Sequence, residues 1–228
     1  MSRFREVRAE GSKSSEEKPC FDAAFRDNLE GLLRWRRDVR HFRSEALPEG
    51  IVDELLQLVC DTAPSVGNSQ PWRFVRPETA PARTAVIRNF EESNAEALAA
   101  QSKDKKALYA SLKLEGLRQA PEQIAVFCDE GTSQGHGLGQ ATMPETRRYS
   151  VVMAIHALWL LLRARGIGMG WVSILEPDRL KQDLDIPDTW SFVGYLCIGY
   201  PQRETRVADL EEAGWQSRRP TTGVFHRR

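Results

Sequence analysis

The stretch RWRRDVRHF, residues 34–42, holds four arginines within seven positions. A guanidinium group donates paired hydrogen bonds from a planar fork and stays charged at any working pH, which suits a phosphate monoester. The simpler interpretation is a solvated helix end whose positive side chains complement the helix dipole. Charge alone favours that simpler interpretation, in which Asp38 pairs with a neighbouring arginine rather than serving as a general base.

A second stretch, PSVGNSQP at residues 64–71, is dense in turn-forming residues and in amide or hydroxyl side chains. Asn68 and Gln70 each offer a donor and an acceptor, and Ser65 adds a hydroxyl group. Flavins present alternating donors and acceptors, so such a loop suits them, and the prolines at its two ends restrict it. Taken alone, an ordinary turn between a helix and a strand is still the better interpretation.

The glycine-rich stretch GIGMGW, residues 166–171, lacks the GxGxxG spacing and the lysine of phosphate-binding glycine loops. It also lies between an expected helix and an expected strand, whereas a Rossmann turn lies between a strand and a helix. We expect its glycines to allow close approach of the backbone to a flat ligand or a packed helix. Ser173 lies on the expected strand 171–175 and points to one face, which in isolation indicates a structural role.

The 228 residues are 41% hydrophobic and 28% charged, with a formal net charge of zero. These ordinary values provide no overall field toward nucleic acid or a membrane, and we expect neither as a partner. Four cysteines and four histidines are scattered without a CxxC pair, so we expect reduced thiols, no metal site and a cytoplasmic location. The N-terminus lacks a signal peptide's apolar stretch, and the longest apolar run, 151–162, is too short to span a bilayer.

The pattern of apolar residues predicts mainly helices and a few short strands, hence an α+β domain with helices packed on one small sheet. We expect residues 1–20 to be a disordered leader, residues 21–219 a single domain and residues 220–228 a basic tail. The expected helices cover 25–37, a segment starting at Pro48, two pieces within 84–117, and 151–162, and the expected strands cover 72–75, 123–128, 171–175 and 192–198.

Taken in order, four motifs resemble those of the nitroreductase-like FMN-binding family: residues 36–42, 63–72, 166–171 and 199–201. The resemblance covers residues 22–219 and outweighs the simpler interpretation of each motif. It implies a small mixed, mainly antiparallel sheet packed by helices, in an intertwined homodimer with FMN at the subunit interface. The implied FMN contacts are Arg36, Arg37 and Arg40 at the phosphate end and Ser65, Asn68 and Gln70 at the ring or ribityl chain, with Asp38, Val39 and Ser173 beside them. Arg218 is a candidate for a further phosphate contact, but sequence alone does not rank the basic residues of the tail.

Within this family the sequence is most similar to the 5,6-dimethylbenzimidazole synthase branch, also called flavin destructases. Asp38 stands where ordinary nitroreductases usually carry Ser or Thr, and the runs 111–117, 170–175 and 210–219 also resemble this branch. The resemblance implies an oxygen-dependent fragmentation of reduced FMN into D-erythrose 4-phosphate and 5,6-dimethylbenzimidazole, the lower ligand of cobalamin. It implies that Asp38 and Ser173 matter for that chemistry, and we expect them to act as base and as hydrogen-bonding partner.

Two alternatives remain open. An NAD(P)H-dependent nitroreductase would use the same phosphate and ring contacts but would recycle FMN, and a non-catalytic flavin-binding protein would return it intact. Reducing equivalents are expected from NAD(P)H through reduction of the flavin, by this chain or by a separate flavin reductase. Residues 111–117 are expected to belong to a lid over the flavin.

Overall fold

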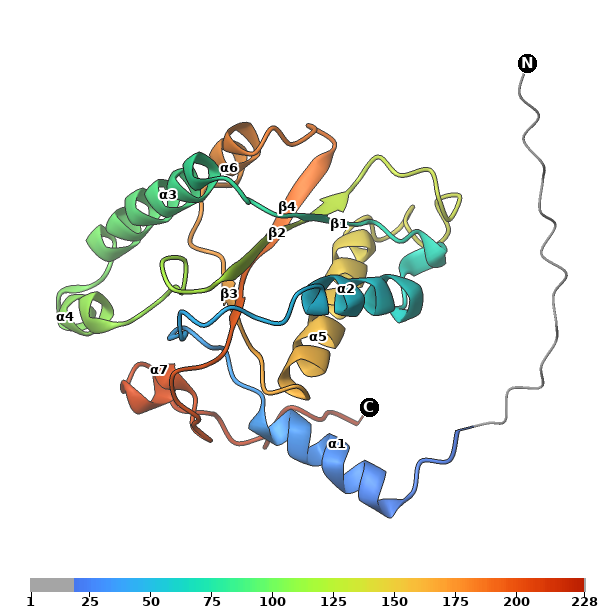
Figure 1. Ribbon diagram of the computed structural model, residues 1–228, viewed down its shortest axis with the longest axis horizontal. Helices are drawn as coiled ribbons and strands as arrows, with labels where there is room; N and C mark the ends of the chain where they lie inside the picture. The colour runs from blue at the N-terminus through green and yellow to red at the C-terminus, as the bar shows by residue number, and fades with distance from the viewer. Residues whose placement is uncertain (1–18, 228) are drawn as a thin grey trace, which may run out of the picture.

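The computed structural model describes residues 19–227 (Figure 1). Most of the predicted leader, residues 1–18, and the last residue of the predicted tail lie outside the described residues. The helices are α1 (Ala23–Trp35), α2 (Ile51–Thr62), the 3-10 helix η1 (Val66–Asn68), α3 (Ala80–Ala99), α4 (Lys103–Ser111), α5 (Thr146–Arg163), α6 (Pro177–Asp183) and α7 (Asp209–Glu212). The strands are β1 (Trp72–Val75), β2 (Glu122–Asp129), β3 (Gly168–Val172) and β4 (Trp190–Gly199).

The four strands form one sheet in the order β1-β2-β4-β3, and each neighbouring pair is antiparallel. Side chains alternate across the sheet, so Ile124 and Val126 of β2 belong to one core while Ala125 and Phe127 belong to the other. The predicted small, mainly antiparallel sheet packed by helices is confirmed.

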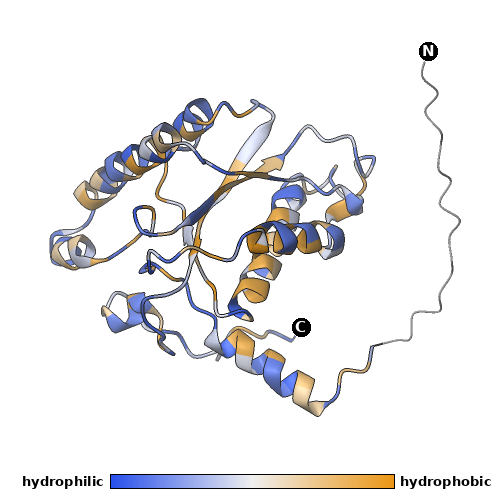
Figure 2. Cartoon of the chain, viewed as in Figure 1, coloured by the Kyte–Doolittle hydropathy of each residue, from blue (hydrophilic) through white to orange (hydrophobic). Residues whose placement is uncertain are grey.

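Helices cover both faces of this sheet. In Figure 1, α2 and α5 lie together against one face, and α3 and α6 lie against the other. Helix α5 buries Val151, Ile155, Leu158 and Leu162 completely, as their helical spacing predicted. Figure 2 shows the most hydrophobic ribbon segments where α5 and β2 meet the core. In the part of the chain that is described, no helix combines the length and the apolar character needed to cross a membrane.

The arginine-rich segment 36–42 runs beside β3. The backbone N–H of Val39 donates to the carbonyl of Met169 at 3.1 Å, and an isolated parallel bridge pairs Asp38 with Met169. A Cβ atom on Gly170 would lie 2.1 Å from the Val39 carbonyl oxygen, so only glycine allows this approach. The glycine allows a close backbone approach, as expected, but the neighbour is an extended segment and not the predicted flat ligand or packed helix.

Several predicted element boundaries are wrong. Helix α1 ends at Trp35 and not at residue 37, and α5 begins at Thr146 and not at residue 151. Pro48 lies in the turn before α2, where the Ile51 N–H donates to its carbonyl. Gly50, in a left-handed conformation, is the N-cap residue, and the helix begins at Ile51. The helical segment expected to reach residue 117 ends at Ser111, because the chain then extends toward residue 40. Strand β3 ends at Val172, so Ser173 lies just after the strand and not within it.

Candidate functional site

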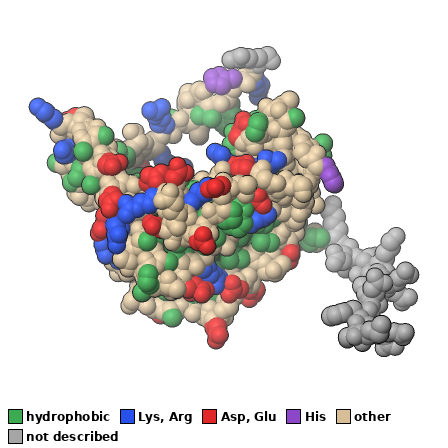
Figure 3. Space-filling model, turned by 90° about the horizontal axis from the view of Figure 1, so that it is seen from above, with side chains coloured by type: hydrophobic (Ala, Val, Ile, Leu, Met, Phe, Trp, Pro, Cys, Tyr) green, Lys and Arg blue, Asp and Glu red, His purple; other side chains and the backbone are tan. Residues whose placement is uncertain are grey.

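A cleft of about 570 Å³ opens where segment 36–42 meets the C-terminal part of the chain. Its lining contains more guanidinium groups than carboxylates. The basic residues are Arg34, Arg36, Arg37, Arg206 and Arg218, and the acidic residues are Asp38 and Glu211. Over the face shown in Figure 3, by contrast, acidic and basic side chains are interspersed. This local excess of positive, planar donors suits a phosphate group.

Arg36 is the half-buried cleft arginine that stacks on an aromatic ring, whereas Arg206 and Arg218 are exposed. Its guanidinium carbon lies 4.6 Å from the centroid of the Trp159 ring, a cation–π distance. Among the described residues, it makes no ion pair and no side-chain hydrogen bond. Burial lowers the pKa of Arg36 below its ordinary value, Asp38 raises this pKa, and the positive charges of Arg37 and Arg218 lower it again. A bound dianion would relieve the repulsion among these three arginines.

Arg37 is partly committed to the backbone. One terminal nitrogen donates to the carbonyls of Arg34 at 2.8 Å and Arg36 at 2.7 Å, and the other donates to the carbonyl of Arg206. Arg206 in turn lies over the ring of Trp35, at 5.7 Å from its centroid. Arg37 therefore ties the C-terminal part of the chain to the end of α1, as well as lining the cleft.

Asp38 sits at the inner edge of the cleft with both carboxylate oxygens engaged. Oδ1 accepts from the backbone N–H of Trp171 at 2.9 Å, and Oδ2 accepts from Nε of Arg40 at 2.8 Å. Burial raises the pKa of the Asp38 carboxyl above its ordinary value, although the Arg40 charge and the Trp171 N–H act to lower this pKa. A carboxylate with a raised pKa is a better proton acceptor than an ordinary one.

Arg40 does not line the cleft. Its second bond runs from Nη1 to the carbonyl of Lys113 at 3.1 Å, so it joins Asp38 to the segment after α4. Val39 also points elsewhere, with its side chain packed against Gly168. The structure therefore brings Arg36, Arg37, Asp38 and Arg218 together, and places Arg40 and Val39 behind them.

Ser173 is exposed and follows β3 directly. It comes two residues after Trp171, whose backbone N–H holds the Asp38 carboxylate. The two residues predicted to act in the chemistry are thus connected through the end of one strand.

Hydrogen bonds and packing hold the amide-rich loop, residues 64–71, in place. The hydroxyl of Ser65 accepts from the Gln70 backbone N–H at 3.1 Å, and Gln134 donates to the Gln70 side-chain carbonyl at 2.8 Å and to the Asn68 carbonyl at 2.9 Å. A Cβ on Gly135 would lie 2.6 Å from the carbonyl of Gly67, so the glycine-rich loop 131–139 packs directly on it. The side chain of Asn68 stays exposed on the rim.

Within one chain, the arginine segment and the amide-rich loop lie at different ends of α5. The backbone N–H of Val66 donates to Ser150 near the beginning of this helix, whereas Trp159 contacts Arg36 and Arg37. Ser150 and Trp159 are nine positions apart, which corresponds to about 13 Å of helix. One copy of the chain therefore places the residues predicted to contact the phosphate and those predicted to contact the ring or ribityl chain at different ends of α5.

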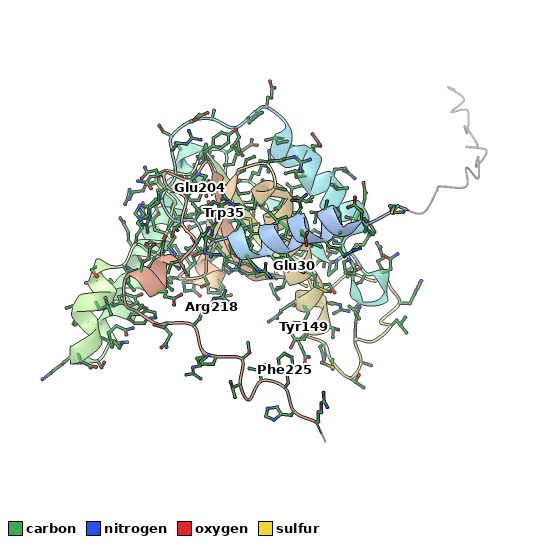
Figure 4. All side chains as sticks on the ribbon, turned by 90° about the horizontal axis from the view of Figure 1, so that it is seen from below. Glu30, Trp35, Tyr149, Glu204, Arg218 and Phe225 are labelled. Carbon is green, nitrogen blue, oxygen red and sulfur yellow. The ribbon has the colours of Figure 1, made fainter. Side chains whose placement is uncertain are left out.

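Sequence reasoning missed Trp159 and Arg206. Trp159 lies within the apolar run 151–162, which indicates only a buried helix, and its contact with residue 36 spans a long sequence separation. Arg206 belongs to a basic C-terminal region in which no local pattern distinguishes one arginine from another. Figure 4 shows how the chain brings this region under α1, with Arg218 below Trp35 and Phe225 farther along.

Comparison with known proteins identifies the family of this chain. The model of the nitroreductase family matches residues 33–200. The chain is 60% identical over 202 residues to a 5,6-dimethylbenzimidazole synthase of Rhodospirillum rubrum, covering 89% of this chain and 95% of that protein. It is 46% identical over 201 residues to the protein of the same name from Rhodobacter capsulatus, covering 88% and 97%.

Among solved structures, oxidised iodotyrosine deiodinase bound to FMN and 3-iodo-L-tyrosine superposes with a TM-score of 0.66 at 23% identity, over 87% of this chain and 97% of that chain. This likeness establishes the shared fold. The family resemblance predicted from the four motifs is confirmed. The chain belongs to the nitroreductase family, in the branch of its 5,6-dimethylbenzimidazole synthase relatives.

Proposed function

We propose that this chain is an enzyme that fragments reduced FMN with molecular oxygen, releasing D-erythrose 4-phosphate and 5,6-dimethylbenzimidazole, the lower ligand of cobalamin. The observation that carries the proposal is the Asp38 carboxylate at the edge of an arginine-lined cleft, in a chain 60% identical to a 5,6-dimethylbenzimidazole synthase. FMN is then the substrate, and the cleft holds the phosphate that both FMN and the sugar product carry.

The roles of the side chains follow from their places. Arg36, Arg37 and Arg218 line the cleft and are proposed to bind the FMN phosphate. When bound, reduced FMN supplies the electrons for oxygen. Asp38 accepts a proton at the carboxylate, and the exposed hydroxyl of Ser173 donates a hydrogen bond to the reacting flavin. Ser65, Asn68 and Gln70 contact the ring or ribityl chain, and Arg40 holds Asp38 in place.

We further propose that NAD(P)H provides the electrons, through this chain or a separate flavin reductase, and that the enzyme works in the cytoplasm. A cytoplasmic pool of reduced pyridine nucleotide would sustain both routes. If anaerobic mixing with NAD(P)H alone reduces bound FMN, the chain itself performs this step. If reduction requires an added flavin reductase, the second protein is needed.

We propose that the functional unit is a homodimer of the single domain, residues 21–219, in which the loop 64–72 of one chain completes the cleft of the other. Helix α1 supports this because, within the described residues, none of its side chains is fully buried. Phe25, Leu29 and Leu33 are each 42–45% exposed and recur every four residues, so they share one face. Exposed apolar side chains on α5, Val152 and Met153, add to the surface that a second copy would cover.

Leu29→Glu is expected to convert the dimer into monomers, because a charge replaces an apolar side chain at the centre of that face in both copies. Size-exclusion chromatography with light scattering gives the measurement. Gly31→Glu is the matched control, since residue 31 lies about 200° around α1 from residue 29 and has open space beside it. A Leu29→Glu protein that stays dimeric would show that this face of α1 is not the dimer interface.

One experiment tests the proposed function against its two rivals. The protein is mixed anaerobically with one equivalent of photoreduced FMN and then exposed to air, while flavin absorbance is followed and products are identified by mass spectrometry. Loss of flavin with appearance of 5,6-dimethylbenzimidazole supports the proposal. Full return of oxidised FMN, with rapid turnover of a nitroaromatic acceptor and NAD(P)H, would identify a nitroreductase. Full return without such turnover would identify a flavin-binding protein.

A further inference from the structure

We propose that Trp159 is a positioning residue that makes the cleft selective for a phosphorylated flavin, by holding Arg36 in its phosphate-binding orientation. This inference rests on the proposed function, in which the cleft binds the FMN phosphate. Trp159 lies on the face of α5 that meets segment 36–42 and belongs to none of the four motifs.

Trp159 makes two contacts with two consecutive residues. Its ring lies under the Arg36 guanidinium group at 4.6 Å, and its Nε1–H donates to the carbonyl oxygen of Arg37 at 3.2 Å. The first contact orients a side chain and the second fixes the backbone that carries it. Together they define where the Arg36 guanidinium can lie relative to the cleft.

The support beneath Trp159 is rigid. Its neighbour Leu158 is completely buried, as are Ile155 and Leu162 on the adjacent turns of α5. On its other side the Trp159 ring lies 6.5 Å from the ring of Trp171, whose backbone N–H binds Asp38. The indole is therefore anchored to the core at one side and faces the arginine segment at the other.

Arg36 needs this support because the Asp38 carboxylate, which would compete with phosphate for its guanidinium group, is close by. The charge of Asp38 acts on the Arg36 guanidinium and raises its pKa, so the two groups attract each other. Without the stacked ring, Arg36 could swing toward Asp38 and compete with Arg40 for the carboxylate. A flexible arginine would also lose rotamer freedom on binding phosphate, a cost that the stacked position removes beforehand.

The test compares the affinities of FMN and riboflavin, which differ by the phosphate group. In Trp159→Leu, FMN is expected to bind about tenfold more weakly while riboflavin binding changes less than about twofold, since one desolvated cation–π contact is lost. The KM for reduced FMN should rise while kcat stays near that of the unaltered protein. Trp159→Phe keeps a ring but loses the N–H. Its preference for FMN over riboflavin should fall between that of the unaltered protein and that of Trp159→Leu.

Trp190→Leu is the matched control. The ring of Trp190, at the first position of β4, lies under Arg73 at 5.6 Å, so the same type of contact is removed away from the cleft. We expect this variant to keep the ratio of FMN to riboflavin affinity even if its thermal stability falls. Circular dichroism and melting curves for all variants separate loss of fold from loss of selectivity.

The outcomes distinguish a failure of the proposed function from a failure of the proposed role of Trp159. If the unaltered protein binds FMN and riboflavin equally well, the phosphate-binding cleft and the proposed function fail together. If it prefers FMN and Trp159→Leu retains that preference, the function stands and the role of Trp159 is overturned. An equal loss of FMN and riboflavin affinity would overturn it as well, because Trp159 would then support the whole site.

Discussion

Replacing Asp38 by asparagine should lower the rate of 5,6-dimethylbenzimidazole formation by at least ~100-fold, the contribution typical of a positioned general base. Asparagine has nearly the same shape, and its Oδ1 can still accept the Trp171 N–H that now binds the carboxylate at 2.9 Å. Its amide nitrogen, however, cannot take a proton and cannot accept from Arg40 Nε. The backbone of segment 36–42 should therefore stay in place while the base is lost.

FMN binding is the measurement that makes this result specific. Removing a negative charge from the cleft edge should leave the affinity of FMN unchanged or slightly higher. Asp183→Asn on α6 is the control, because its side chain is 29% exposed against 31% for Asp38 and also pairs with an arginine. Full product formation by an Asp38→Asn protein that binds FMN normally would end the assignment of Asp38 as the base.

The raised pKa of Asp38 predicts opposite pH trends for stability and for rate. The folded protein binds the Asp38 proton more tightly than the unfolded chain does, so the protonated carboxyl stabilises the folded state. This contribution to the free energy of unfolding is fully present below the ordinary pKa of 3.8. It is lost as the pH rises through the higher pKa of the folded protein. The rate should instead increase through that same folded pKa, because the base must be deprotonated. Urea unfolding and initial rates of the unaltered and Asp38→Asn proteins, measured from pH 4 upward, check both trends, which should vanish in the variant.

Local patterns predicted the parts of the fold that depend on nearby residues. Strand β1 begins and ends where alternation placed it, at Trp72 and Val75, and the buried stripe of α5 is where helical spacing placed it. Boundaries set by distant contacts were missed. The helix expected to reach residue 117 stops at Ser111, after which the Lys113 carbonyl accepts from Arg40, a partner 73 positions away.

In the candidate site, too, local sequence patterns predicted some features, and features set by distant contacts were missed. The first motif identified Arg36, Arg37 and Asp38, the resemblance added Arg218 as a candidate, and the structure brings all four to one cleft. Motifs could not tell which of several arginines faces the ligand, because that depends on what each guanidinium meets in three dimensions. Arg40 turns to Asp38 and Lys113, and Arg206, which no motif marked, enters the cleft instead.

Arg36→Ala should weaken FMN binding by about 100-fold, and this prediction separates the cleft arginines most sharply. Two charge-assisted hydrogen bonds to phosphate contribute about 3 kcal/mol in favourable geometry, and each 1.4 kcal/mol is about tenfold in affinity. Arg206 and Arg218, like Arg36, make no side-chain hydrogen bond or ion pair among the described residues, but they are exposed. Arg36 is expected to contribute most because it is half-buried and its guanidinium lies 4.6 Å from the centroid of the Trp159 ring. Riboflavin binding should barely change, and titration calorimetry with both flavins measures the difference.

Arg34→Ala gives the matched comparison, because Arg34 lines the same cleft two residues earlier but is 78% exposed and already bound to Glu30 at 2.7 Å. Removing it deletes the same charge and the same side-chain length, so a loss that came from net charge alone would be similar in both variants. Exposed and paired charges contribute little, and we expect the affinity of the Arg34→Ala protein to fall less than about threefold. Equal losses for the two variants would mean that the cleft attracts phosphate by its summed field, and that the fixed position of Arg36 has no special part in binding.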